Sequence, residues 1–312
     1  MKDLVSIGLS AAILAVEGER PAVLVVAHDG QHDALPFGPF DPAHHRTLEQ
    51  GLRKWVGEQT AFDLGYTEQL YTFGDKGRHL SGGGEGRVVS VGYLALTRQG
   101  PEKAADTETQ WRSWYQYFPW EDWCDTKPAM IDGVILPALR KFVKDAPNAE
   151  TAELRRERLN MCFGDSWDEE RVLERYELLY EAGLVEEFHR DSGKAAKPGL
   201  GAPMLFDHRR ILATAIARLR GKLKYRPVVF ELMAPTFTLL ELQRAVEALA
   251  GLRLHKQNFR RLVAEQGLVE GTGRFAIQTR GRPAELFRFR REVLRERPAP
   301  GMRLGVRRSK PA

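Results

Sequence analysis

The chain of 312 residues has little cysteine and no long apolar run. Its two cysteines, Cys124 and Cys162, form no CxxC pair, so the sequence indicates neither a disulfide framework nor a zinc site. No run reaches the roughly 20 apolar residues that span a bilayer, so we expect no membrane segment. The apolar stretch 4–16 leads into Glu17–Arg20, a poor cleavage site, and therefore predicts a buried strand instead of a signal peptide. Together these features favour a cytoplasmic protein.

Charge is distributed unevenly along the chain. Residues 209–312 contain 24 basic and 8 acidic side chains, whereas the whole chain has a net charge of only +5. The C-terminal third is therefore strongly basic and the remainder is acidic. A basic segment of this kind favours a polyanionic partner such as nucleic acid. The alternative is a solvated basic tail without a partner.

Residues 1–100 alternate strands with a single helix. Apolar positions spaced at i, i+4, i+7 and i+8 predict a helix over residues 47–60. Apolar runs bounded by turn residues predict the strands 5–16, 22–27, 69–73 and 87–96. This alternation predicts a small α+β or α/β domain.

Residues 101–200 have a different composition. Seven of the thirteen residues in 111–123 are aromatic, and helices are predicted near 128–145, 149–160 and 167–182. We interpret this region as a helical insert that ends in a linker. The aromatic run either packs in a core or stacks on a ligand ring such as nicotinate or adenine.

Residues 201–295 have the signals of a helix-turn-helix that follows a first helix at 206–219. Thr238 and Glu241 form a capping box that begins a helix, and Gly251 ends it. A second helix begins near His255 and ends at Gly267. A similar short stretch around Gly183 predicts, like that around Gly267, a helix that ends at glycine and leads into a strand.

The second helix of this pair has one apolar and one polar face. At 100° per residue its apolar side chains cluster, and His255 lies nearer to them as a packed or capping residue. The candidate DNA-binding residues on and beside the polar face are Lys256, Gln257, Asn258, Arg260 and Arg261. Such side chains read base edges in a major groove, although an ordinary solvated helix face has the same composition.

A β-hairpin is predicted directly after this helix. Residues 275–278 and 285–289 can pair, with Arg280 and Arg282 at the tip as candidate phosphate contacts. The hairpin completes a winged helix-turn-helix, and residues 296–312 form a basic flexible tail. Two copies on a palindromic double-stranded operator would supply enough base contacts, so we expect a homodimer.

Gly38 and the helix that follows it resemble the signature of the Nudix hydrolases, and this resemblance implies an α/β/α sandwich in the N-terminal domain of an α+β protein. Their signature places a glycine before a helix that gathers several metal-binding glutamates, and here Gly38 precedes the stretch 53–60. Arg53 and Glu58 match the signature, but Lys54 and Gly57 stand at two glutamate positions. One carboxylate cannot assemble the usual metal cluster, so we expect no catalytic residues, no bound metal and no hydrolysis.

Further stretches resemble the NrtR family of Nudix-related regulators of NAD metabolism, and the long insert is most similar to the related NadQ regulators. The matching stretches are Gln69–Asp75, Gly86–Val91, Arg218–Leu223, Phe230–Leu232, Phe237–Leu239, Glu241–Gln243, Asn258–Arg261 and Gly281–Pro283. This resemblance implies a repressor of NAD biosynthesis or salvage genes, with an NAD-related effector and no cofactor. ADP-ribose, NAD, ATP and nicotinate are the candidate effectors, and Phe73, Arg78 and Arg87 are the candidate ligand-binding residues.

Two other functions are compatible with parts of the sequence. An active nucleotide-diphosphate hydrolase with a nucleic-acid-binding extension is disfavoured by Lys54 and Gly57. An RNA-binding protein that uses the basic domain is disfavoured by the helix-turn-helix with its wing. The operator and the sign of regulation do not follow from the sequence.

Overall fold

The computed structural model describes residues 5–28, 32–60, 62, 64–74, 87–98, 109–194, 199–276 and 283–302. The candidate residues Arg78, Arg280 and Arg282 lie outside these ranges, as do the glycines at 82–84 and most of the segment 296–312. Predictions about those residues are therefore not tested by the structure.

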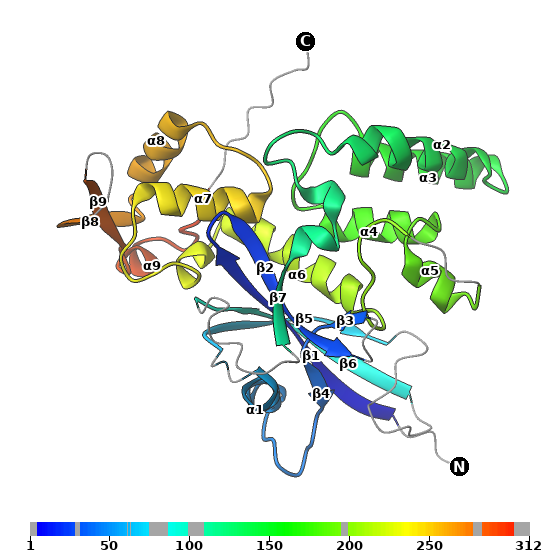
Figure 1. The fold of residues 1–312 in the computed structure, drawn as a ribbon, viewed down its shortest axis with the longest axis horizontal. Coiled ribbons are helices and arrows are strands. Elements are labelled where there is room, and N and C mark those ends of the chain that lie inside the picture. The colour runs from blue at the N-terminus through cyan, green and yellow to red at the C-terminus, as the bar shows by residue number, and fades with distance from the viewer. Residues whose placement is uncertain are drawn as a thin grey trace.

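A mixed seven-stranded sheet forms the centre of the N-terminal half (Figure 1). Its path is β3-β2-β1-β6-β5, with β4 paired to β1 and β7 paired to β2. The long strands β1 and β6 are parallel, and the other pairs are antiparallel. The strands are β1 (Val5–Glu17), β2 (Arg20–His28), β3 (His32–Ala34), β4 (Phe37–Pro39), β5 (Tyr66–Phe73), β6 (Arg87–Leu96) and β7 (Thr109–Ser113).

Helices cover both faces of this sheet. Alternate residues of β1 point to opposite faces, so Leu9 and Ile13 pack in a cluster with α1 (Leu48–Thr60), whereas Ala12 and Leu14 pack in a cluster with α6 (His208–Leu223). The predicted α/β/α sandwich is confirmed. Its second layer is α6, a helix that the sequence analysis assigned to the C-terminal domain, because periodicity cannot show which partner a helical face meets.

The aromatic run connects the sheet to the rest of the molecule. Its first residues form β7, a sheet strand that was not predicted, and two short 3-10 helices follow, η2 (Trp114–Gln116) and η3 (Pro119–Glu121). The side chains of Trp114, Tyr117, Phe118 and Trp120 are fully buried. The interpretation of the run as core packing is therefore confirmed.

The insert contains a projecting helical hairpin and a smaller helical layer (Figure 1). The elements are the π-helix η4 (Ile131–Ile135), α2 (Leu136–Lys144), α3 (Ala149–Phe163), α4 (Val172–Glu181) and α5 (Glu186–Asp191). Gly183 adopts the predicted left-handed conformation, with φ of 70°. The chain then enters α5, so the strand expected after Gly183 is wrong.

The C-terminal part combines short helices with a hairpin. Its elements are η5 (Val228–Glu231), α7 (Leu239–Ala250), α8 (Lys256–Gln266), β8 (Val269–Ala276), β9 (Ala284–Phe289) and α9 (Val293–Glu296). The hairpin predicted at 275–289 is confirmed, but β8 begins six residues earlier because the chain enters it directly after α8. Within the described part of the chain, no helix is both long and apolar enough to cross a membrane.

Candidate nucleic-acid interface

Helix α7 begins at the capping box that the sequence predicted. The Thr238 hydroxyl accepts a hydrogen bond from the backbone N–H of Glu241 at 3.2 Å, and the Glu241 carboxylate accepts one from the N–H of Thr238 at 2.7 Å. Gly251 ends the helix with φ of 74°. Both ends of α7 are thus defined by local residues.

Two buried polar side chains of α7 fix the turn that leads to α8. Gln243 donates to the carbonyl of Leu254 at 2.9 Å and to the Glu247 carboxylate at 2.8 Å. The same carboxylate accepts the N–H of Leu254 at 2.8 Å. These contacts hold the start of α8 against α7, which sets the direction in which α8 presents its outer face.

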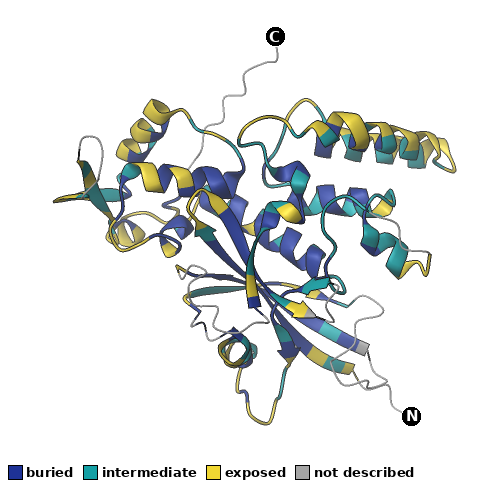
Figure 2. Cartoon of the chain, in the orientation of Figure 1, coloured by how far each residue is buried: buried dark blue, intermediate teal, exposed yellow. Residues whose placement is uncertain are grey.

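Helix α8 buries Phe259 and Val263 and turns its polar side chains outward (Figure 2). All five candidate residues, Lys256, Gln257, Asn258, Arg260 and Arg261, are exposed. His255 occupies the N-cap position, as the capping alternative predicts, although its side chain makes no capping hydrogen bond; because this side chain is exposed, the packed alternative is wrong. The outer face carries cations and amides that can reach a polyanion.

The wing is joined to the helices through its backbone. Phe237 exchanges two hydrogen bonds with Phe287 of β9, at 3.0 and 2.8 Å. The rings of Phe230 and Phe289 stack with their centroids 4.4 Å apart. These contacts hold the hairpin against η5 and the start of α7, so that helices and hairpin form the single unit of a winged helix.

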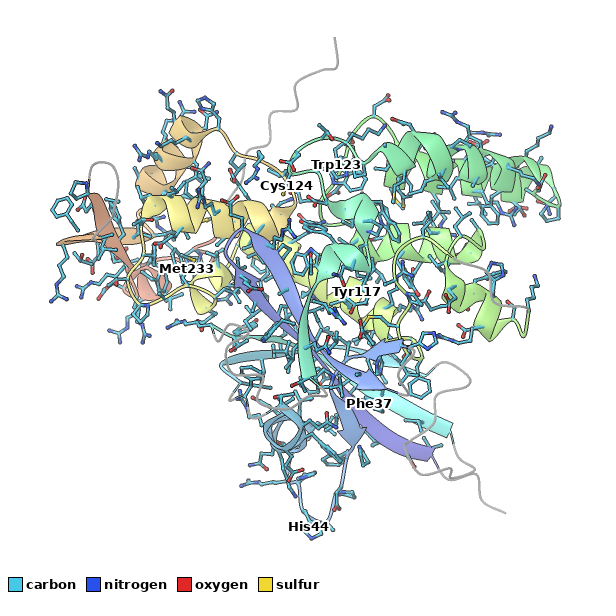
Figure 3. The ribbon with its side chains drawn as sticks, in the orientation of Figure 1. Phe37, His44, Tyr117, Trp123, Cys124 and Met233 are labelled. Atoms are coloured by element: carbon cyan, nitrogen blue, oxygen red, sulfur yellow. The ribbon has the colours of Figure 1, made fainter. Side chains whose placement is uncertain are left out.

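The far end of α7 contacts the aromatic run that follows the sheet. The Tyr115 hydroxyl donates a hydrogen bond to the carbonyl of Ala248 at 3.0 Å. The backbone N–H of Trp123 donates one to the carbonyl of Gly251 at 2.9 Å. Trp123 lies beside the end of α7 (Figure 3). The carbonyl groups that a helix leaves unsatisfied at its C-terminus are therefore used to attach α7 to the N-terminal half.

A buried ion cluster lies behind this contact. Glu121 accepts hydrogen bonds from Arg175 at 2.6 and 2.9 Å and from Arg220 at 2.7 Å. All three side chains are at most 1% exposed. Arg220 also donates to the carbonyl of Leu249 at 2.9 Å. This cluster joins η3, α4, α6 and α7, and the sequence analysis did not identify it, because its members are far apart in the chain.

The helix that resembles the Nudix signature is engaged in structural contacts. The ring of Trp55 lies over Gly38 so closely that a Cβ atom there would be 2.3 Å from it, and its indole N–H donates to the carbonyl of Pro39 at 2.7 Å. Arg53 donates to the carbonyl of Gly65 at 3.2 Å. Lys54 is exposed. In the described ranges, no three His, Cys, Asp or Glu side chains are grouped in a way that could hold a metal ion.

A glutamate one turn before the signature also has local partners. Glu49 accepts hydrogen bonds from Thr67 at 2.8 Å and from Arg53 at 3.0 Å. These contacts, the Thr67 bond most of all, hold the pKa of Glu49 below its ordinary value. The carboxylate is therefore ionised and used to anchor α1 to β5.

Of the three predicted ligand residues, the structure describes the side chain of Phe73 alone. Phe73 is 4% exposed, and its ring lies against Gly92 inside the core. This position supports packing instead of the predicted stacking on a ligand. Arg87 is described by its backbone only, which pairs with Val5, and Arg78 lies outside the described residues.

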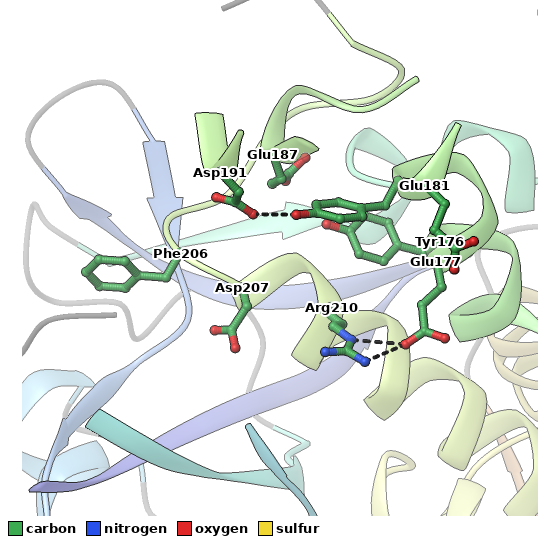
Figure 4. A pocket seen from close by; sticks show the side chains of 9 residues that line it. Tyr176, Glu177, Glu181, Glu187, Asp191, Phe206, Asp207 and Arg210 are labelled. Atoms are coloured by element: carbon green, nitrogen blue, oxygen red, sulfur yellow. Dashed lines mark hydrogen bonds and ion pairs between the residues drawn. The ribbon is translucent and has the colours of Figure 1, made fainter. Parts of the chain in front are cut away.

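A cavity of about 500 Å³ that the sequence analysis missed lies between α4, α5 and the start of α6 (Figure 4). Tyr176 and Tyr180 of α4 line it. Their i, i+4 spacing places both rings on one face of the helix, and this spacing was the available signal.

Comparison with known proteins supports the fold and identifies one domain. A model of the NrtR DNA-binding winged helix domain matches residues 229–289. Residues 229–289 are therefore similar to the DNA-binding domain of the NrtR regulators. The ADPR responsive transcriptional repressor NtrR of Acinetobacter baylyi is 44% identical over 86 residues, a match that covers 28% of the chain and 34% of that relative. The match therefore spans about a third of the curated relative.

Solved structures show a similar arrangement over most of the chain. Shewanella oneidensis NrtR complexed with a 27mer DNA has a TM-score of 0.55 at 22% identity, covering 92% of this chain and 94% of that one. A MutT/nudix family protein from Enterococcus faecalis has a TM-score of 0.52 at 16% identity, covering 93% and 88%. At these identities the likeness shows a shared fold, and it confirms the predicted fold class.

Proposed function

We propose that this NrtR-type chain is a transcriptional repressor that binds double-stranded operator DNA through α8 and the wing. The observation that carries the proposal is the exposed outer face of α8 within the matched winged helix domain. Its Gln257 and Arg261 read base edges, and Lys256, Asn258 and Arg260 add base or phosphate contacts. Arg280 and Arg282 of the wing tip contact phosphate.

The N-terminal sandwich acts as the sensor in this proposal. The Acinetobacter relative is named for its response to ADP-ribose, so ADP-ribose is the first candidate effector, before NAD, ATP and nicotinate. The regulated genes are those of NAD biosynthesis or salvage, and the closer similarity to NadQ stays a prediction. Because one such helix offers too few base contacts for genomic specificity, the chain acts as a homodimer on a palindrome.

The sensor binds its effector without cleaving it. Lys54 and Gly57 replace two metal-binding glutamates, and Trp55 fills the space over Gly38. The second candidate function, an active hydrolase, needs a cluster of carboxylates beside the diphosphate. The local contacts of Arg53 and Glu49 favour a structural role for this helix.

Two experiments test these proposals separately. Pull-down of sheared genomic DNA with the purified protein should enrich an inverted repeat upstream of NAD genes. A protein–operator complex should then be titrated with each of the four candidate effectors in the presence of magnesium, with an assay for product. We expect release of the operator by ADP-ribose without turnover. Release of ten-fold to hundred-fold corresponds to about 1.4–2.8 kcal/mol of differential affinity. Turnover at ordinary enzyme rates would establish the hydrolase instead.

A further inference from the structure

The cavity between α4, α5 and α6 has walls unlike those of a nucleotide site. Five carboxylates line it, from Glu177, Glu181, Glu187, Asp191 and Asp207. Among the described residues that line it, Arg210 is the single basic one, and Glu177 accepts its hydrogen bonds at 2.7 and 3.0 Å. Glu181, Glu187 and Asp191 also form ion pairs with arginines that do not line the cavity. A phosphate group would therefore meet carboxylates with no uncommitted cation to receive it.

The carboxylates of this cavity are also spread out. No three of the acidic or histidine side chains described in this structure are grouped closely enough to hold a metal ion. A small divalent cation needs six or more oxygen ligands within about 2.6 Å, so it does not fit this arrangement. A longer organic cation has its charges separated along a chain, so each charge can lie beside a different carboxylate.

Two tyrosines supply the aromatic part of the wall (Figure 4). The rings of Tyr176 and Tyr180 have centroids 6.5 Å apart, and the Tyr180 hydroxyl donates to Asp191 at 3.0 Å. Tyr176 is only 3% exposed, and its hydroxyl has no hydrogen-bond partner among the residues that the structure describes. Because Tyr176 lines the cavity, this hydroxyl is available to form a hydrogen bond with a ligand bound there.

We propose that this cavity binds a linear organic polyamine. One ammonium group donates to the Tyr176 hydroxyl, a second lies near Asp191, and the methylene chain packs against the tyrosine rings. Ammonium groups are attracted to both carboxylates and aromatic faces. This site is separate from the proposed effector site in the sandwich, and it does not depend on DNA binding.

Isothermal titration calorimetry of the full chain with spermidine tests the proposal. DNA is left out because its phosphates bind amines, and the ionic strength is held constant. We expect saturable binding of one spermidine per chain, little heat with inorganic phosphate, and no displacement by an equal concentration of Mg²⁺. The absence of saturable binding, or displacement by equal Mg²⁺, would overturn the proposal.

Three variants locate the site. Tyr176→Phe removes one hydroxyl, and Asp191→Asn removes one charge from a residue that is partly exposed and so tolerates the change. Each should weaken spermidine binding by about threefold to tenfold, the effect of one lost hydrogen bond or charge contact. Asp145→Asn on the projecting hairpin makes the same charge change elsewhere and should leave binding unchanged. Equal affinity in all three variants would show non-specific attraction and refute the site.

Discussion

Two groups of arginines in this chain have opposite surroundings. Arg175 and Arg220 are fully buried, and both donate to Glu121. Arg260 and Arg261 on α8 are exposed, and the described partner of Arg261 is Glu265 at 3.8 Å. A buried guanidinium must be paired because desolvation is costly, whereas an exposed one keeps its water until a polyanion displaces it. Burial therefore separates arginines that hold the junction from arginines that are available for DNA.

The largest effect on stability is expected from a substitution that disrupts the buried ion cluster. Glu121→Gln leaves two buried guanidinium groups without a counter-charge, so the free energy of unfolding should fall by about 3–5 kcal/mol in urea titrations. Glu153→Gln, in an exposed pair with Arg156, is the control and should change little. Equal stability of the two variants would mean that the buried cluster contributes no more than a surface pair.

Substitutions on the exposed face of α8 should weaken operator binding and leave stability unchanged. Gln257→Ala and Arg261→Ala should each weaken specific operator binding by about 1–3 kcal/mol, measured by fluorescence anisotropy. Neither should alter the urea midpoint, because both side chains are exposed. Arg156→Ala on α3 is the matched control. Undiminished binding in the double variant Gln257→Ala/Arg261→Ala would refute α8 as the reading helix.

The wing tip should contribute affinity without specificity. Arg280→Ala and Arg282→Ala should weaken binding to operator and random DNA evenly. Each lost phosphate contact should reduce the slope of log affinity against log salt by roughly one unit. An unchanged slope would show that the wing tip makes no phosphate contact.

The smallest effect concerns the ion pair on α8 itself. Glu265→Gln removes the described partner of Arg261, and the stability should change by no more than about 0.5 kcal/mol because the pair is exposed. Operator affinity should stay the same or rise slightly. A loss of stability comparable with that of Glu121→Gln would show that exposure does not separate the two groups.

Local signals allowed much of the winged helix to be predicted. The capping box at Thr238, the left-handed glycines 251 and 267 and the apolar face of α8 act over three or four residues, and the structure reproduces each of them. The exposed face of α8 followed from the same periodicity. The early start of β8 was missed because a strand paired to one neighbour alone has a weak apolar alternation.

Less of the N-terminal sandwich could be predicted from the sequence. Strand β6 was predicted with correct bounds, but β7 was hidden in the aromatic run, and Phe73 was assigned to a ligand although it packs against Gly92. An aromatic residue has the same sequence signal whether it covers a ligand or a neighbouring strand. Only its surroundings distinguish the two.

The sequence by itself determined the features that depend on near neighbours. These are the helix ends, the strand and helix periods, the charge asymmetry and the presence of Lys54 and Gly57 at positions where the Nudix signature has glutamates. The tertiary structure decided what depends on distant partners. It placed α6 against the sheet, brought Glu121 to Arg175 and Arg220, and enclosed the tyrosine-lined cavity. Periodicity says that a face is buried, but the identity of what covers it depends on packing between residues far apart in the chain.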